Sequence, residues 1–233
     1  MIVRQLVGPG VAVAEMRADT PAPIPFPEEE RAVRRACARR RREFASGRAC
    51  ARQALVSLGA APVPIPKGRK GEPLWPPGLV GSITHCQGLR AAAVARAEDV
   101  VSLGIDAEVN APLPRGVFER IACGEELALR GPAELDGVEA VHRDRLLFSA
   151  KESIYKAWFQ LRRCWLGFSD ARVSVDLADT SFRCLLRVPG PWVGGVQLQE
   201  LRGRWTVGEG LLASAVVIPS GGGLCGLLTG LRP

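Results

Sequence analysis

The 233-residue chain is short of lysine. Of its 31 basic residues only four are lysine (Lys67, Lys70, Lys151 and Lys156), and arginine supplies the rest. Lysine is therefore kept in two short stretches, where a compact ammonium group can do something that a planar guanidinium cannot. These stretches are the first places to look for a functional site.

Paired cysteine motifs are missing as well. The seven cysteines are odd in number and scattered, without a CxxC pair, which argues against a disulfide framework or a cysteine zinc site. No charged-then-apolar secretory segment opens the sequence. We therefore expect reduced thiols in a cytoplasmic protein.

One uncharged stretch, from Gly210 to Leu231, is long enough for a membrane helix. Pro219-Ser220-Gly221-Gly222-Gly223 interrupts it, and Leu211 to Ile218 is rich in small and β-branched residues. This pattern favours a buried strand followed by a loose tail, so we expect no membrane span.

Signatures for common nucleotide and nucleic-acid sites are also lacking. There is no Walker motif, no helix-turn-helix or RNA-binding signature, and no aromatic residue among the clustered arginines. The composition, 47% hydrophobic and 24% charged, is that of a globular protein with one large domain or two small ones. A net charge of +7 favours acidic partners such as nucleic acid, anionic lipid, phosphorylated ligands or acidic proteins.

The first part of the chain predicts short strands and then a helix. Residues 2–16 indicate one or two strands broken at Gly8-Pro9-Gly10, and residues 21–27 alternate prolines as a linker does. Glu28-Glu29-Glu30 after Pro27 favours a helix start, because acids stabilise the positive end of a helix. We expect this helix to run into Arg39–Arg42.

A second helix is predicted from about Ser46 to Leu58, ending at Gly59, with Arg48 and Arg52 on one face. The arginines of this region form either a solvated surface or a cradle for an anion, and the run alone favours the solvated surface.

The first lysine stretch lies in a basic loop, residues 64–76. Lys67, Arg69 and Lys70 are combined there with two glycines and fixed proline turns. Such a backbone can approach a phosphate group closely.

Two further sets of polar residues follow the loop. His85, one of only two histidines, stands beside a turn at Gln87-Gly88 that precedes a strand through Val94. Residues 100–105 predict a strand, so Asp106 and Glu108 point to one face at its end. Carboxylates at i and i+2 suit Mg²⁺, although the pair taken alone favours a polar strand end.

The second lysine stretch predicts a helix entered after Asp144 and left near Arg162-Arg163. Leu147, Ile154, Trp158 and Leu161 recur at helical spacing and predict its core-facing stripe. Glu152 and Lys156 lie four apart on another face, where they can touch. Because Phe148, Tyr155 and Phe159 flank the two charges, we expect partly dry surroundings, which is costly for charges. An ordinary surface ion pair is the simpler alternative.

Two motifs in this order resemble the 4′-phosphopantetheinyl transferase family. They are Gly104-Ile105-Asp106-Ala107-Glu108 and, further on, Phe148-Ser149-Ala150-Lys151-Glu152-Ser153-Ile154-Tyr155-Lys156. The Phe-Ser-Ala-Lys-Glu-Ser form is similar to the branch that includes the enterobactin synthetase D component. The resemblance covers roughly residues 28–218.

The resemblance implies an α/β (α+β) fold, a pseudo-dimer of two similar α/β halves with coenzyme A in the cleft between them. The halves would be residues 1–103, with the basic coenzyme A-binding elements, and 104–218, with the metal ligands and the catalytic helix; residues 219–233 would be a tail of unknown role. Gly88–Ala95 resembles Gly210–Val217, a faint trace of such a duplication.

The family also implies an activity: Mg²⁺-dependent transfer of 4′-phosphopantetheine from coenzyme A to a serine of an apo acyl or peptidyl carrier protein. The other product would be adenosine 3′,5′-bisphosphate. We expect a cytoplasmic monomer that binds neither nucleic acid nor membranes and serves siderophore, polyketide or nonribosomal peptide biosynthesis. The sequence leaves the carrier proteins themselves open.

By the same resemblance, Asp106, Glu108 and Glu152 would hold Mg²⁺, with Mn²⁺ as an alternative ion. Glu152 would also take the serine proton, directly or through a water, and Lys156 and His85 would contact the phosphates. The remaining coenzyme A contacts would come from Arg40, Arg48 and Lys67, with Arg52, Lys70 and Thr84 as further candidates. Thr84 and Cys86 stand where many members have serine.

A cation among three acids is expected on physical grounds too. Two like charges about 4 Å apart repel by about 4 kcal/mol at an effective dielectric constant near 20, whereas one helical Glu–Lys pair returns under about 1 kcal/mol. Two alternatives stay open from the residues: another Mg²⁺-dependent phosphoryl or nucleotidyl transferase, and a non-catalytic basic module that binds nucleic acid.

Overall fold

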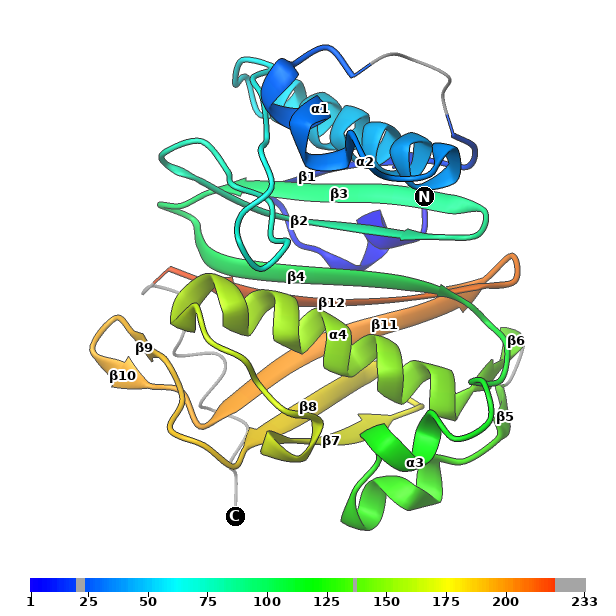
Figure 1. Cartoon of the computed structure of the whole chain (residues 1–233). Helices are drawn as coiled ribbons and strands as arrows, with labels where there is room; N and C mark the ends of the chain where they lie inside the picture. The colour runs from blue at the N-terminus through cyan, green and yellow to red at the C-terminus, as the bar shows by residue number, and fades with distance from the viewer. Residues whose placement is uncertain (20–23, 136–137, 221–233) are drawn as a thin grey trace.

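Two antiparallel sheets dominate the computed structural model, which describes residues 1–19, 24–135 and 138–220 (Figure 1). The smaller sheet has the order β1-β3-β2, with β1 at Val11–Met16, β3 at Leu89–Arg96 and β2 at Leu79–Cys86. A 3-10 helix, η1 (Val3–Leu6), precedes it, so the expected strands of residues 2–16 are one helical turn and one strand. The carboxylate of Glu15 accepts the amides of Ile2, Val3 and Arg4, which favours the turn over a strand.

Helices α1 (Pro27–Val33) and α2 (Ala38–Ser57) lie over one face of the smaller sheet (Figure 1). The start of α1 at Pro27 is confirmed, but the expected division into helices ending after Arg42 and beginning at Ser46 was wrong. The chain turns earlier, with Cys37 in an extended conformation, so Arg39–Arg42 belong to the first turns of α2. The turn lets the buried Glu29 of α1 accept hydrogen bonds from Arg52 of α2.

The larger sheet has the order β4-β12-β11-β8-β7 and is crossed by the long helix α4 (Figure 1). The segments concerned are β4 (Val100–Val109), α4 (Arg143–Arg162), β7 (Ala171–Asp176), β8 (Ser181–Leu186), β11 (Glu200–Gly208) and β12 (Leu211–Pro219). The predicted strands at 100–105 and 211–218 and the predicted helix are therefore confirmed. Short elements fill the connections: α3 (Phe118–Ile121), η2 (Gly124–Leu129), β5 (Pro132–Leu135), β6 (Val138–His142), η3 (Phe168–Asp170), β9 (Trp192–Val193) and β10 (Val196–Gln197).

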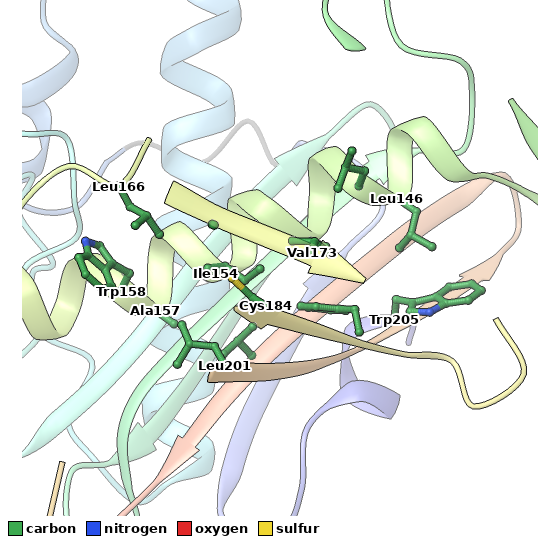
Figure 2. Packing of buried hydrophobic residues seen from close by; sticks show 14 of the residues in the cluster. Leu146, Ile154, Ala157, Trp158, Leu166, Val173, Cys184, Leu201 and Trp205 are labelled. Carbon is green, nitrogen blue, oxygen red and sulfur yellow. The ribbon is translucent and has the colours of Figure 1, made fainter. Parts of the chain in front are cut away.

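The main core lies between α4 and the larger sheet. Figure 2 shows Ile154, Ala157 and Trp158 of α4 in one cluster with Cys184, Leu201 and other sheet residues. Of the predicted stripe, Leu147, Ile154 and Trp158 are buried and Leu161 is half-buried. Since η2, α3 and β7 also contact α4, the helix is covered on more than one side.

The two sheets meet along β2 and β4 through side chains. Ser82 Oγ accepts the amide of Ile105 at 3.1 Å, and Thr84 Oγ1 accepts the amide of Ala107 at 3.0 Å. Hydroxyl oxygens thus receive the N–H groups that β4 turns away from β12. This seam brings the end of β2 beside the end of β4, where the acidic pair stands.

The duplication expected from the sequence stays a prediction. The two similar segments form β3 and β12, and each is a buried strand between two neighbours of its sheet. The boundary expected between residues 103 and 104 falls inside β4, which is continuous. Residues 221–233 of the expected tail lie outside the described residues. Within the described part of the chain, no helix combines the length and apolarity needed to cross a membrane.

Candidate active site

The site is organised by a close crossing of α4 over β4 at Gly104. A Cβ atom at this position would lie 2.0 Å from Ser153 O and 2.8 Å from Ala157 N, so only glycine lets the helix come so near. The face of β4 that carries Gly104 also carries Asp106 and Glu108, while Ile105 and Ala107 face the core behind. The crossing therefore presents the acids of the strand to α4.

Asp106 is the buried centre of the site, with 5% of its surface exposed. Its Oδ1 accepts hydrogen bonds from Lys156 Nζ at 2.8 Å and from Thr84 Oγ1 at 3.3 Å. Lys156 also donates to Ile105 O. In place of the expected contact with Glu152, one turn before it on α4, Lys156 forms an ion pair with Asp106, because α4 crosses close over β4.

Glu108 is paired with Arg145, which the sequence did not single out. Arg145 donates to Glu108 Oε2 at 3.0 Å and to the carbonyls of Ala111 and Pro112, which fixes the loop after β4 on the first turn of α4. Burial, followed by the nearby Asp106 charge, raises the pKa of Glu108 to about 7 even with Arg145 beside it. The Glu108 carboxyl therefore gains or loses its proton near neutral pH.

Glu152 has neither a hydrogen bond nor an ion pair to another described residue. Burial raises the pKa of its carboxyl, the Lys156 charge lowers it, and the Asp106 charge raises it further. A half-buried carboxylate without a protein partner takes its hydrogen bonds from water or from a ligand. Glu152 is accordingly the group in this site most open to a ligand.

His85 joins the site from the end of β2. Its Nε2 lies 2.9 Å from Arg40 NH1 and 3.5 Å from Glu43 Oε2. Burial, then the Arg40 charge, lowers the pKa of His85, so its Nε2 accepts from the always-charged guanidinium. The charges of Arg40 and Lys156 near this neutral imidazole favour the binding of an anion there.

Arg48 and Arg52 lie one turn apart on α2 but have different partners. Arg48 is buried, donates through Nε to Ile65 O and stacks over Phe44, and burial lowers its pKa to about 10. Arg52 donates to both oxygens of Glu29, which is fully buried. The role of Arg52 toward coenzyme A stays a prediction, although this geometry supports a structural role.

A cavity of about 390 Å³ opens between the basic loop, β2 and α4. Lys70 lines it from the loop, and Glu152 and Lys156 line it from α4. Gly81 allows Trp75 to lie on β2, since a Cβ there would meet the indole ring at 2.5 Å, and this contact holds the loop over the cavity. Lys67 forms a β-bridge with Pro73 at the base of the loop and is exposed.

A second cavity of about 140 Å³ lies on the other side of Glu152, beside Trp165, Leu166 and Phe168. Glu152 and Tyr155 line both cavities. The rings of Tyr155 and Trp165 are 5.0 Å apart, and 72% of Trp165 is exposed. The unpaired carboxylate therefore stands where a polar cavity and a more apolar one meet.

Among the described residues, no three His, Cys, Asp or Glu side chains are gathered closely enough to hold a metal ion as they stand. Lys156 and Arg145 neutralise two of the three expected ligands instead. The donors nevertheless suit a hard cation, because Asp106 Oδ2 is buried without a hydrogen-bond partner and Glu152 is unpaired. The carboxylates are therefore ligands of the kind that Mg²⁺ prefers. To bind the ion, Asp106 and Glu108 would have to part from the side chains of Lys156 and Arg145.

Comparison with known proteins identifies the family. The chain matches the model of the 4′-phosphopantetheinyl transferase N-terminal domain over residues 28–95 and that of the 4′-phosphopantetheinyl transferase superfamily over residues 102–207. It is also 49% identical to the 4′-phosphopantetheinyl transferase Svp of Streptomyces mobaraensis, over 88% of this chain and 83% of that protein. The chain belongs to the 4′-phosphopantetheinyl transferase superfamily.

Other relatives place the chain within this superfamily. The 4′-phosphopantetheinyl transferase PptT of Mycobacterium tuberculosis is 45% identical over 89% of this chain and 92% of its own length. Enterobactin synthase component D of Salmonella typhimurium, of the branch that the Phe148–Ser153 motif indicated, is 35% identical over 64% of this chain and 60% of its own length. The resemblance drawn from the two motifs is thus confirmed, with higher identity to Svp and PptT than to component D.

The sequence found most of the side chains that the structure brings together in this phosphopantetheinyl transferase. Asp106, Glu152, Lys156 and His85 surround one region, with Glu108 at its edge. It missed Arg145, whose partner Glu108 is distant in the chain, and Glu43, which lies within 4 Å of the distant His85 as well as of Arg39 and Arg40. It also missed the buried ion pair of Lys151 with Glu126, although the scarcity of lysine had marked Lys151.

Proposed function

We propose that this protein transfers 4′-phosphopantetheine from coenzyme A to a serine hydroxyl of an apo acyl or peptidyl carrier protein. One observation carries the proposal: the unpaired Glu152 and the Lys156–Asp106 pair stand together where two cavities of different character meet. A substrate with a pyrophosphate between two unlike ends fits such a junction.

Coenzyme A has such ends. Its phosphorylated nucleoside would lie in the larger cavity under the basic loop, where Lys70 and Arg163 are among the lining residues. Arg40, Arg48 and Lys67 would add positive charge around its phosphates, and the neutral His85 would add a hydrogen-bonding group. Thr84 would hold Asp106. The pantetheine arm would lie in the smaller cavity against Trp165, Leu166 and Phe168.

The bond changes follow from this placement. The serine oxygen bonds to the phosphorus that carries pantetheine, and the pyrophosphate bond on its far side breaks, so adenosine 3′,5′-bisphosphate leaves. The serine proton passes to the Glu152 carboxylate, directly or through a water, and the raised pKa of this group suits a general base. Lys156 neutralises charge on the phosphate in transfer, which is the main demand of phosphoryl transfer.

Asp106, Glu108 and Glu152 would hold Mg²⁺, or Mn²⁺ in its place. When bound, the ion would supply charge stabilisation at the pyrophosphate. Lys156 and Arg145 have to leave Asp106 and Glu108 as this occurs, which would free Lys156 for the phosphate.

The test is an incubation with Mg²⁺, coenzyme A and a panel of apo carrier proteins, read by intact mass. We expect the mass of phosphopantetheine to appear on a carrier, and Asp106→Ala and Glu152→Ala to abolish the gain while the variants keep their folded spectra. Transfer by either variant near the wild-type rate at saturating Mg²⁺ would refute the metal assignment. No mass gain with any carrier, together with turnover of another nucleotide or salt-steep binding of DNA, would favour the alternatives.

A further inference from the structure

Lys151 stands next to Glu152 in α4, yet its ammonium group is directed away from the reacting region. Only 3% of Lys151 is exposed. Its Nζ donates to Ile121 O, Glu126 Oε2 and Phe168 O, each at 2.8 Å. All three protons of the ammonium group are therefore used inside the protein.

Glu126 completes this arrangement from η2. It is 1% exposed, and its Oε1 accepts the amide of Val173 at 2.7 Å. Its Oε2 accepts the Cys123 amide at 2.8 Å and the Cys123 thiol at 3.3 Å, besides Lys151. One buried ion pair thus connects five segments: α3, η2, η3, β7 and α4.

Three of these segments form walls of the smaller cavity. Phe168 of η3 and Ala171 of β7 line it, and Lys151 itself lines it beside Glu152. The hydrogen bond from Lys151 to Phe168 O therefore sets how far this wall lies from the turn of α4 that carries Glu152. A change in this contact alters the position of a bound group relative to the Glu152 carboxylate.

Stability alone does not explain the pair. A buried ion pair is often no more stable than apolar residues of the same volume, because both charges are desolvated, whereas three directional bonds from one ammonium fix a geometry that apolar packing does not. The same region also contains an exposed ion pair. Glu119 and Arg130 lie 2.7 Å apart, with 54% and 62% of their side chains exposed.

We propose that Lys151 and Glu126 are positioning residues for the transfer reaction. They hold the wall of the smaller cavity at a fixed distance from Glu152 and touch neither the reacting phosphate nor the serine. The inference rests on the proposed function, since it concerns the geometry in which Glu152 meets its substrates.

The experiment compares steady-state transfer by the wild type and the double variant Lys151→Met/Glu126→Gln. This variant contains no buried charge, keeps the side-chain volumes similar and leaves an amide oxygen for one backbone N–H. We expect kcat to fall about 10- to 100-fold, since small displacements of reacting groups have effects of this size. The coenzyme A Kd, from calorimetry, should stay within a factor of about three, and the urea midpoint should stay near that of the wild type.

The matched control is Glu119→Gln/Arg130→Met, which removes the exposed pair of the same region and should keep the wild-type kcat. Glu126→Gln alone, which is isosteric but turns an amide donor toward Lys151, gives a second measurement in case the double variant folds poorly.

Each outcome is decisive. A lower kcat with retained affinity and folding supports positioning. A wild-type kcat in the folded double variant or, if that variant does not fold, in Glu126→Gln, would show that the pair serves the fold alone. A parallel loss of coenzyme A affinity would assign it to substrate binding and also overturn the proposal. If the wild type itself transferred nothing, the proposed function would fail separately.

Discussion

At the scale of single residues, the polar groups of the site other than Glu152 already have partners inside the protein. Lys156 is held by Asp106, Glu108 by Arg145, and His85 by Arg40. Such pairs are predictable in part only. Periodicity placed Asp106 and Glu108 on one face of a strand, and spacing placed Lys156 on the helix. Neither reveals which partner is nearest, because that depends on contacts between distant segments.

At Lys156 a substitution can separate the effect of the positive charge from the effect of the side chain's shape. Arginine there would keep the charge, but its longer, planar fork does not fit the space in which Nζ meets Ile105 O and Asp106 Oδ1. We expect Lys156→Arg to lower kcat about 100-fold or more. Steady-state kinetics of the variant and the wild type provide the measurement, and a mild effect of Lys156→Arg would indicate a structural pair.

Glu108 predicts a dependence of stability on pH in the metal-free protein. Its pKa is about 7 in the folded state against an ordinary 4.5, so its contribution to folding is fully present below the lower value and is lost as pH rises through the higher one. Relative to Glu108→Gln, the wild type should lose about 1–3 kcal/mol of unfolding free energy across that window.

Urea unfolding in a chelating buffer from about pH 5 to about pH 8 measures this difference. A free-energy difference between the two proteins that stays constant with pH would mean that Glu108 titrates normally.

At the scale of elements, the crossing of α4 over β4 decides where the acids stand. In Gly104→Ala the added methyl group would meet backbone atoms at 2.0 and 2.8 Å, so helix and strand have to move apart. We expect a loss of about 1–3 kcal/mol in stability and a fall in kcat of more than about tenfold. Gly208→Ala, where no atom lies within 4 Å of the added carbon, is the matched control. Equal behaviour of the two variants in unfolding and transfer assays would contradict this account of the crossing.

Elements differed in how far the sequence revealed them. The helix around Ser153 and the strands β4 and β12 were predictable, because the local sequence shows apolar periodicity in the helix and β-branched runs in the strands. The break between α1 and α2 was not, since residues 28–46 contain neither glycine nor proline. The break brings Glu29 to Arg52, a contact between two helices that no local pattern predicts.

At the scale of the whole molecule, the excess of positive charge is expected to act on the carrier protein. By the family resemblance we expect the carrier protein to be acidic near its acceptor serine. Attraction between opposite fields is screened over about 8 Å at physiological salt. The KM for carrier protein should rise with ionic strength, while that for coenzyme A should change less because its phosphates would lie in a partly closed cavity.

The Arg39–Arg42 run narrows this prediction. Arg39 and Arg40 lie within 4 Å of Glu43, and Arg41 contacts Glu30 at 3.3 Å, so part of its charge is neutralised locally. Arg42 is exposed. Arg39→Gln/Arg42→Gln should therefore flatten the salt dependence for the carrier without changing the KM for coenzyme A. A carrier KM that is flat in the wild type would show that the basic surface serves something else.

The side-chain seam between β2 and β4 also affects how chimeras of two members of this family can be built. Each sheet completes its own backbone ladder, and Ser82 and Thr84 supply the acceptors that join β2 to β4. A chimera crossing over in the turn before β4 would thus inherit two intact sheets from different parents. Its polar compatibility would depend on these two hydroxyl-bearing side chains, since Gly104 and the helix that it admits come from the same parent. The proposed metal-binding acids would come from that parent and the basic loop from the other.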